Sequence, residues 1–214
     1  MKICTSRSVR ALLMMSALTA AVPAAFGQAA GRVWVSFNGA APGTPTSVVV
    51  DRGASNEDRT VFNVSLTGYY DEAVTVPNEG TFHKLSLPAD EEGFLRVDGK
   101  PALPILGMLL GIPTDAPGLA QPIVTVLETS VVDGILVYPT QPEALEEPGN
   151  FQIVPFTQDD AAYLSRATYP ATDGDVGDTA SLFMGLKVQT ASVHPFKYVP
   201  STRSMTIAKR MRVE

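Results

Sequence analysis

The stretch Val97–Leu106, which reads VDGKPALPIL, decides the fold. Asp98-Gly99 is a tight-turn dipeptide, because glycine tolerates the positive φ that such a turn needs. Pro101 and Pro104 fix φ and lack an amide hydrogen, so this stretch cannot run through the middle of a helix or a sheet. The apolar run Ile105–Leu110 follows, and we expect it to be buried. The pattern predicts a stiff crossing segment that leads into a buried strand.

Composition favours one β-rich domain. The chain has 214 residues, and its hydrophobic content of 45% is enough to build a core. It contains 17 glycines and 17 prolines, which favours many short strands joined by turns over long helices. Alternating segments recur along the chain with turn residues between them. We therefore expect an all-β fold, an antiparallel β-sandwich.

Alternation and β-branching locate the expected strands. They lie at Arg32–Phe37, Ser47–Val50, Val61–Leu66, Tyr69–Pro77, Phe82–Leu87, Ile123–Leu127, Ile135–Pro139, Leu182–Val193 and Met205–Val213. Asp133-Gly134 is expected to turn Ile123–Leu127 onto Ile135–Pro139 as a hairpin with a longer or bulged connection. Asp159–Leu164 can form one helical turn, since Tyr169-Pro170 ends any helix early.

The first 27 residues have the pattern of a signal peptide. A basic n-region precedes the short apolar h-region Ala11–Ala25, and small residues precede the expected cleavage after Gly27; the basic residues are Lys2, Arg7 and Arg10. A membrane anchor is the less favoured interpretation, because the apolar run is shorter than the roughly 20 residues that span a bilayer. We expect a mature domain of residues 28–214 without a membrane anchor, exported to the periplasm or the extracellular space.

Charge and cysteine content exclude several functions. Cys4, the only cysteine, leaves with the signal peptide, so the mature domain has neither a disulfide nor a thiol nucleophile. The full chain carries a net charge of −6, and removing the three n-region cations leaves 13 basic against 22 acidic residues, about −9. This acidic balance argues against nucleic acid and anionic membrane surfaces as partners.

The chain lacks a recognisable catalytic set, and we expect no catalytic residue and no cofactor. His83 and His194 have no evident partner in the sequence, and a G-x-S-x-G elbow is missing. One weak metal candidate remains, the calcium-type carboxylates Asp173, Asp175 and Asp178 in a glycine-rich loop. The spacing lacks the closing glutamate of an EF-hand loop, and a turn rich in Asp and Gly explains the same residues.

Several motifs together resemble the N-terminal propeptide of the gingipain-type, family C25 cysteine peptidases. They are the run DGKPALPIL, then Tyr163, Tyr169-Pro170 and the run His194–Pro200, HPFKYVP. The resemblance covers roughly residues 96–214. It implies a jelly-roll-like sandwich that binds its own cysteine endopeptidase in cis and occludes the active-site cleft until it is cleaved off. It also implies proteolysis as the process, with the catalytic residues on another domain.

The resemblance also points to a loop that would block the enzyme. By order along the chain it is Gln141–Pro148, with Glu143, Leu145 and Glu146 as candidate blocking residues. Arginine-specific relatives use a basic residue there, and this loop has none. A plain surface loop is the alternative. A second departure is Leu182–Gly185, where the family often has an arginine.

Two further expectations concern the whole precursor. The alternating pattern persists to Val213, so we expect a fragment that once continued into a catalytic domain. Lys209–Arg212 could serve as a processing site or as exposed strand charges. A different class of function is a free-standing extracellular adhesion or carbohydrate-binding module. Such a module would favour an aromatic platform, whereas aromatic residues make up 7% here with a single tryptophan, Trp34.

Overall fold

The structure is a computed structural model that describes residues 31–88, 92–143, 146–147, 150–151 and 155–214. Its strands are β1 (Arg32–Ser36), β2 (Ser47–Val50), β3 (Phe62–Ser65), β4 (Gly68–Val76), β5 (Gly80–Ser86), β6 (Glu92–Phe94), β7 (Pro104–Gly111), β8 (Val124–Asp133), β9 (Glu146–Glu147), β10 (Asn150–Phe151), β11 (Gly174–Val176), β12 (Ser181–Phe183), β13 (Leu186–Val193), β14 (Phe196–Val199) and β15 (Ser204–Val213). The described residues also contain two short helices, α1 (Asp160–Tyr163) and the 3-10 helix η2 (Pro200–Thr202). The expected signal peptide, its cleavage point at Gly27 and Cys4 lie outside the described residues.

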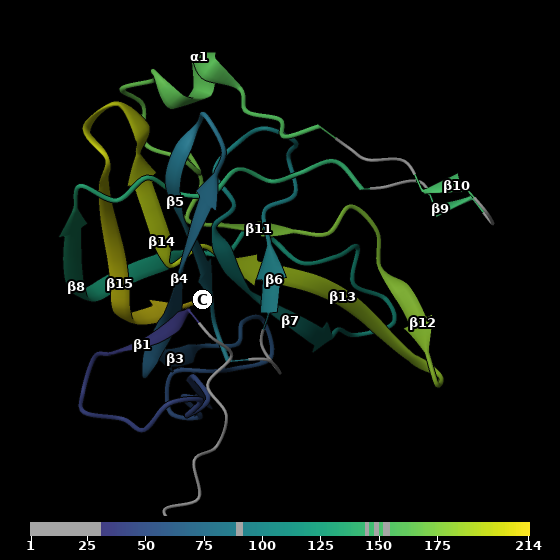
Figure 1. The fold of residues 1–214 in the computed structure, drawn as a ribbon. Coiled ribbons are helices and arrows are strands. Elements are labelled where there is room, and N and C mark those ends of the chain that lie inside the picture. Colours follow the sequence, from purple (N-terminus) through teal and green to yellow (C-terminus); the bar gives the residue numbers. More distant parts are fainter. Residues whose placement is uncertain (1–30, 89–91, 144–145, 148–149, 152–154) are drawn as a thin grey trace, which may run out of the picture.

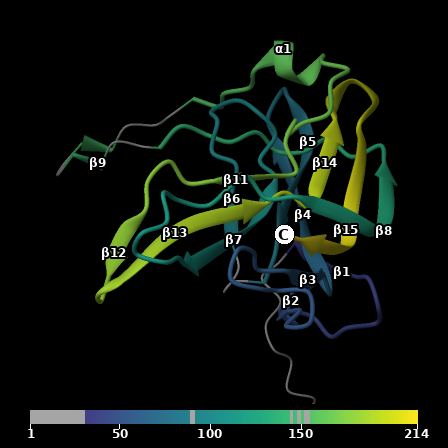
Figure 2. The ribbon, with the colours of Figure 1, turned by 180° about the vertical axis from the view of Figure 1, so that it is seen from behind.

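The strands form antiparallel sheets, as expected (Figures 1 and 2). One five-stranded sheet has the order β11-β13-β7-β6 with β12 beside β13. The other has the order β14-β15-β3-β2 with β8 beside β15. A three-stranded sheet, β1-β4-β5, and the pair β9–β10 complete the described strands. Every pairing between these strands is antiparallel, which confirms the all-β prediction.

The core is shared by all three larger sheets. Leu106 of β7 and Val193 of β13 meet Met205 and Ile207 of β15 there, together with Leu85 of β5. All five side chains are buried. Alternate residues of these strands point inward, because successive side chains of a strand face opposite sides. One continuous apolar cluster therefore holds the sandwich together.

Strand β15 is the centre of its sheet. It pairs along its length with β8 on one side, and with β14 and then β3 on the other. A bulge shifts the β8 register around Lys209. Lys209–Arg212, the possible processing site, therefore lies inside a strand that has partners on both sides.

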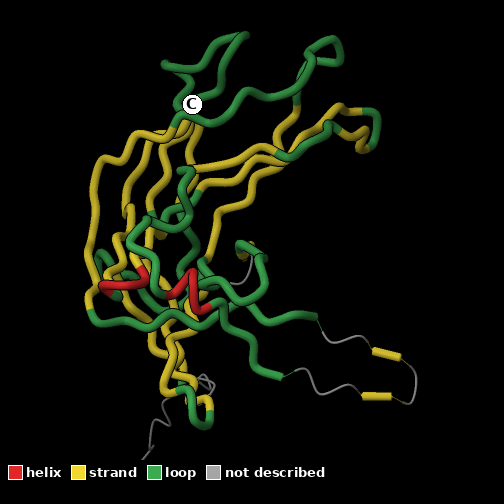
Figure 3. Tube along the Cα trace, turned by 90° about the horizontal axis from the view of Figure 1, so that it is seen from above, coloured by secondary structure: helices red, strands yellow, loops and turns green. Residues whose placement is uncertain are grey.

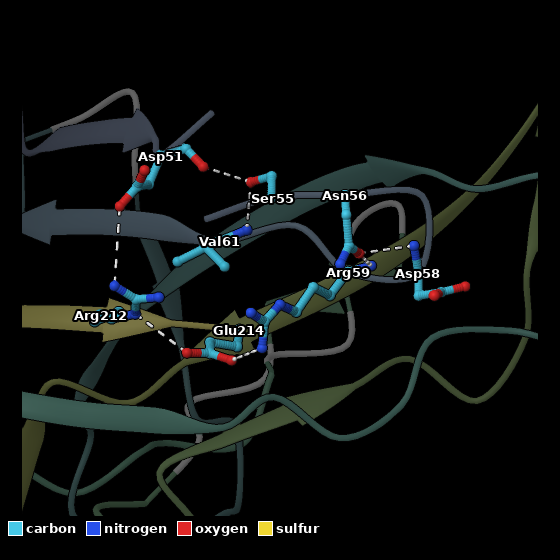
Figure 4. A network of polar contacts seen from close by, with 8 residues as sticks. All are labelled: Asp51, Ser55, Asn56, Asp58, Arg59, Val61, Arg212 and Glu214. Carbon is cyan, nitrogen blue, oxygen red and sulfur yellow. Dashed lines mark hydrogen bonds and ion pairs between the residues drawn. The ribbon is translucent and has the colours of Figure 1, made fainter. Parts of the chain in front are cut away.

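A polar network fastens the end of β15 to the loop after β2 (Figure 4). The Glu214 carboxylate accepts hydrogen bonds from Arg59 and from Arg212, each at 3.1 Å. A second Arg212 nitrogen lies 3.9 Å from the carboxylate of Asp51, which in turn accepts the amides of residues 53 and 54. The network ties residue 214 to a loop more than 150 positions earlier in the chain.

The proline-rich motif leads into a strand, but that strand is only half-buried. Pro104 is the first residue of β7, where the sheet does not need its missing amide hydrogen. Leu106 is buried, whereas Leu109 is 58% exposed. The expectation that all of Ile105–Leu110 is buried is therefore wrong, because β7 packs only one face of its sheet on the core.

The expected hairpin of Ile123–Leu127 with Ile135–Pro139 is also wrong. Strand β8 runs on without a break to Asp133 and pairs with β15. The turn at Gly134 is present, with φ at +76°, but it sends the chain toward other partners. Residues 135–139 form single bridges to His83 and Pro101 instead of a strand.

The expected long strand Leu182–Val193 is a hairpin. Strands β12 and β13 pair with each other across Met184 and Gly185, and both of these residues have positive φ, +50° and +83°. Such a two-residue turn matches the twist of the flanking strands. Methionine is an unusual residue at the first position of such a turn, so the sequence pattern did not indicate a turn here.

Candidate functional site

The turn predicted at Asp98-Gly99 is present, and the backbone that follows it binds the segment Ile135–Thr140. The Lys100 amide donates to the Val97 carbonyl at 3.0 Å, and Gly99 has a φ of +77°. Gly99 and Ala102 then donate their amides to Thr140 and Tyr138, at 2.8 and 2.9 Å. The motif therefore acts as a support for the chain that enters the predicted blocking loop.

The same turn also holds the chain that returns from the loop. The Asp159 amide donates to the Gly99 carbonyl at 2.9 Å, and the Asp159 carboxylate caps α1 by accepting the Ala162 amide at 3.1 Å. A Cβ on Gly99 would lie 2.8 Å from the Asp159 nitrogen. Gly99 is thus required both for its positive φ and for the close approach of the returning segment at Asp159.

Two buried tyrosines of the family motifs hold the entering segment from the other side. The Tyr163 hydroxyl donates to the Val137 carbonyl at 2.6 Å, and the Tyr198 hydroxyl donates to the Ile135 carbonyl at 2.8 Å. Burial raises the pKa of both phenols, so both remain protonated donors at neutral pH. Tyr169 joins them, since its backbone exchanges two 2.8 Å hydrogen bonds with Tyr198.

The two ends of the segment 142–156 are clamped together. The Gln141 amide group donates to the Thr157 carbonyl at 3.0 Å and accepts the Thr157 amide at 2.9 Å. Next to it, the ring of Phe156 packs on Phe82 and Tyr138, with centroids 5.3 and 5.9 Å apart. No motif singled out Gln141 or Phe156 in the sequence, because the clamp joins residues across a segment without periodicity.

An open groove of about 750 Å³ runs beside this clamp. Lys84, Arg96, Asp98 and Glu143 line it together with apolar and aromatic residues. Arg96 donates to Glu143 at 2.8 Å, and both side chains are largely exposed. An exposed pair of this kind contributes little to stability, so both charges can exchange partners when another molecule approaches.

The structure places only part of the predicted blocking loop. Glu143 is exposed at its beginning and pairs with Arg96. Leu145 lies outside the described residues. Glu146 lies in β9, opposite Phe151 of β10, and the orientation of its side chain is not described. Figure 1 shows β9 and β10 away from the body of the molecule.

The three aspartates proposed for calcium have protein partners or lie apart. Asp173 pairs with Lys197 at 2.8 Å, and Asp175 lies 3.5 Å from the ring of His194. Asp178 is exposed beyond the end of β11. Within the residues that the structure describes, no group of three or more His, Cys, Asp or Glu side chains could hold a metal ion.

Both histidines have partners, which corrects the expectation that they had none. His83 contacts the Asp71 carboxylate at 2.8 Å across the β4–β5 pair. His194 is buried, and its Nδ1 lies 3.0 Å from the Thr172 carbonyl, so this nitrogen carries the proton and donates it. These contacts give both rings a structural role.

Trp34 does not form an open aromatic platform. Its indole nitrogen donates to the Ala40 carbonyl at 2.9 Å, and its ring packs on Tyr70 with centroids 4.9 Å apart. The Arg32 guanidinium lies 4.3 Å from the Tyr70 ring centroid, on the same small cluster. Among the described residues, no helix is long and apolar enough to cross a membrane.

Comparison with known proteins identifies the family. The model of the Propeptide_C25 family matches residues 54–214, which is most of the chain, and the chain belongs to this family. The match begins well before residue 96, so it includes strands β3 to β5, in which no family motif was evident. No curated protein matches the chain.

Two solved structures share the fold. The first concerns the zymogenic latency of gingipain K from Porphyromonas gingivalis; it has 20% sequence identity and a TM-score of 0.60, covering 86% of this chain and 97% of that one. The second is the complex of the RgpB pro- and mature domains from the same organism. It has 17% identity and a TM-score of 0.60, and covers 78% of this chain and 80% of that one.

Proposed function

We propose that this chain is the inhibitory propeptide of a secreted gingipain-type cysteine endopeptidase, which it binds in cis and keeps latent. It occludes the active-site cleft until the connection to the catalytic domain is cut, and it assists folding of that domain. The observation that carries the proposal is the convergence of the family motifs on one place. Gly99 binds the chain on both sides of the segment 142–156, and Tyr163 and Tyr198 bind the part that enters it.

This arrangement suits an inhibitor because it lowers the cost of binding. A loop that must be ordered on contact loses conformational entropy, and a loop whose two ends are already fixed loses less. Gln141 and Thr157 fix the ends of the segment, and Phe156 anchors one of them in an aromatic cluster. The sheets provide the rigid body behind it.

The chemistry of the segment predicts the preference of the enzyme. From Gln141 to Gln158 the chain has no Lys or Arg, so no basic residue can enter a primary specificity pocket. Glu143, Leu145 and Glu146 are the blocking candidates. The proposed enzyme therefore accepts an acidic or an apolar residue, in contrast to arginine-specific relatives.

Export follows from the same proposal. Residues 1–27 direct the precursor out of the cytoplasm and are cleaved after Gly27, and the mature chain works in the periplasm or outside the cell. The RgpB structure holds a pro-domain together with a mature domain, which supports a peptidase domain as the partner of this chain.

An inhibition assay tests the proposal. The mature chain is titrated against the gingipain-type peptidases encoded in the same genome, with mature RgpB and gingipain K as additional enzymes. We expect the wild type to inhibit at least one enzyme fully at saturation. A variant with Glu143→Ser, Leu145→Ser and Glu146→Ser should lose most of that inhibition.

The matched control is Glu79→Ser, which removes an exposed carboxylate from the β4–β5 turn. It should inhibit like the wild type. Full inhibition by the triple variant would remove the segment from the mechanism. Failure of the wild type to inhibit any enzyme of the panel would overturn the propeptide function.

A further inference from the structure

A cluster of large apolar side chains is exposed at the β12–β13 hairpin. We call it the apolar tip; its members are Leu182, Phe183, Met184 and Leu186, which are between 57% and 89% exposed. No charged residue lies between Ser181 and Leu186, although the chain as a whole carries −6. Single exposed apolar residues are common, but a contiguous group of four marks an interaction site.

The apolar tip has a defined shape. Phe183 and Leu186 lie directly opposite each other in the β12–β13 register, so their side chains share one face. Leu182 is paired with Lys187 and points to the other face. Met184 occupies the turn itself, with a φ of +50°. The tip is therefore a preformed wedge with apolar groups on both sides.

One side of the wedge continues onto the sheet. By register, Leu109 of β7 lies opposite Thr190 and on the same face as Phe183 and Leu186. Leu109 is exposed, and Gly107 beside it leaves that face hollow. Both line an open groove of about 540 Å³ with residues of β11 and β13. Leu109 thus adds one exposed apolar side chain to this face, beside the polar groove residues Asp175, Thr190 and Ser192.

The position of the hairpin indicates the partner. Figures 1 and 2 show the hairpin and the pair β9–β10 leaving the body on the same side, and Figure 3 shows them from above, separated from each other. Only a domain large enough to span both projections on that side can contact β9–β10 and the tip together. The four side chains present on the order of 400 Å², about half of the roughly 800 Å² per partner that a stable complex buries. The tip alone is too small to hold a second copy of this chain.

We propose that the apolar tip is a second docking element for the same peptidase domain, inserting into an apolar depression outside the active-site cleft. This inference rests on the proposed propeptide function. The tip contributes affinity, and the segment 142–156 occludes the active-site cleft. Both contacts are made to one peptidase domain. Apolar anchors of this kind slow dissociation and leave association nearly unchanged.

The test replaces the tip without disturbing the hairpin. The tip variant carries Leu182→Thr, Phe183→Thr, Met184→Asn and Leu186→Thr. Threonine keeps the β-propensity of the strands, and asparagine accepts the positive φ at position 184 better than methionine does. Gly185 is kept. Leu164→Thr, which changes an exposed leucine beyond α1, is the matched control. Circular dichroism and thermal unfolding verify that both variants fold.

Binding is measured by biolayer interferometry against the peptidase panel described above, each enzyme with its active-site cysteine changed to alanine. We expect the tip variant to bind at least tenfold more weakly, through faster dissociation, while the Leu164→Thr control binds like the wild type. In the inhibition assay the tip variant should still inhibit fully at saturation, with an inhibition constant raised by the same factor.

The other outcomes separate the two proposals. Equal affinity of the tip variant and the wild type would overturn the docking role and leave the propeptide function in place. Absence of binding by the wild type to the entire panel would overturn both. Sedimentation of the chain alone gives a third result: a wild-type dimer that the tip variant abolishes would assign the surface to a second copy and overturn the proposal.

Discussion

The segment Ile135–Thr140, which enters the predicted blocking loop, and the apolar tip are built in opposite ways. The first has little regular structure, yet Gly99, Tyr163 and Tyr198 donate hydrogen bonds to its backbone carbonyls, and alternate residues of it are buried. The second is a regular hairpin whose large side chains face the solvent. Regular secondary structure and tight fixation are therefore different properties in this molecule.

The difference separates stability from recognition. Substitutions around the segment Ile135–Thr140 break buried packing or leave buried polar groups unpaired. Both effects lower the free energy of unfolding. Substitutions in the apolar tip change a surface that contributes little to folding, so their effect is confined to binding. Four measurements test this contrast.

The largest effect is expected at a pair of leucines. Leu103 is fully buried in the proline-rich motif and Leu182 is exposed in the tip. Leu103→Ala should lower the free energy of unfolding by about 2–5 kcal/mol, because it leaves a cavity in the core. Leu182→Ala should change it by less than about 0.5 kcal/mol. Urea unfolding followed by circular dichroism measures both, and equal losses would erase the contrast.

A pair of glycines gives the next effect. Gly99 and Gly185 both have positive φ, but of the two only Gly99 would place a Cβ against a neighbouring segment, at Asp159. Gly99→Ala should cost about 2–3 kcal/mol, and Gly185→Ala about 1 kcal/mol from the backbone conformation alone. Denaturant midpoints of the two variants measure the difference. A smaller cost at position 99 than at 185 would show that Asp159 moves aside freely.

The hydroxyl of Tyr163 should contribute less than the cost of Leu103→Ala or of Gly99→Ala. Tyr163→Phe leaves the Val137 carbonyl without its 2.6 Å donor and should cost about 1–2 kcal/mol. Amide hydrogen exchange around residues 135–140 should accelerate, while exchange in the β12–β13 hairpin should remain at the wild-type rate. Unchanged exchange at residues 135–140 would contradict the role of the Tyr163 hydroxyl in holding this segment.

The fourth test changes pH instead of a residue. Burial and the nearby Asp71 charge raise the pKa of Tyr69 to about 12, and burial raises those of Tyr163 and Tyr198. An unfolded tyrosine ionises near pH 10, so the stability that these groups provide is complete below pH 10 and falls as pH rises toward 12. Urea midpoints between pH 8 and 12 measure this decline. The tip contains no titratable group, so the tip variant should follow the same curve, and a different slope would contradict its independence.

Local pattern predicted the motif region well. Turn residues predicted the turn at Asp98-Gly99, proline predicted the beginning of β7, and β-branched residues predicted β2 at Ser47–Val50. The single helical turn before Tyr169 was also confirmed, as α1. In each case the determining residues lie within a few positions of one another, so the sequence contains the whole cause.

Prediction failed where the cause lies far away in the chain. The partner of β8 is β15, about 80 residues later, and no local pattern could show it. The turn at Met184-Gly185 lacks the usual Asn or Asp, so the sequence pattern predicts one strand where the structure has a hairpin. At the candidate site, the residues that bind Gln141 and His83 come from other parts of the chain, and the positions of Leu145 and Glu146 side chains remain predictions.

The central place of β15 has a consequence for synthesis. Strands β3 and β8 are made first, but each finds its main partner only when Ser204–Val213 has been translated. Long-range pairings of this kind make folding slow, and they leave strand edges exposed meanwhile. For the export that we propose, this order of folding is suitable, because a chain whose larger sheet is still incomplete can pass through an export channel.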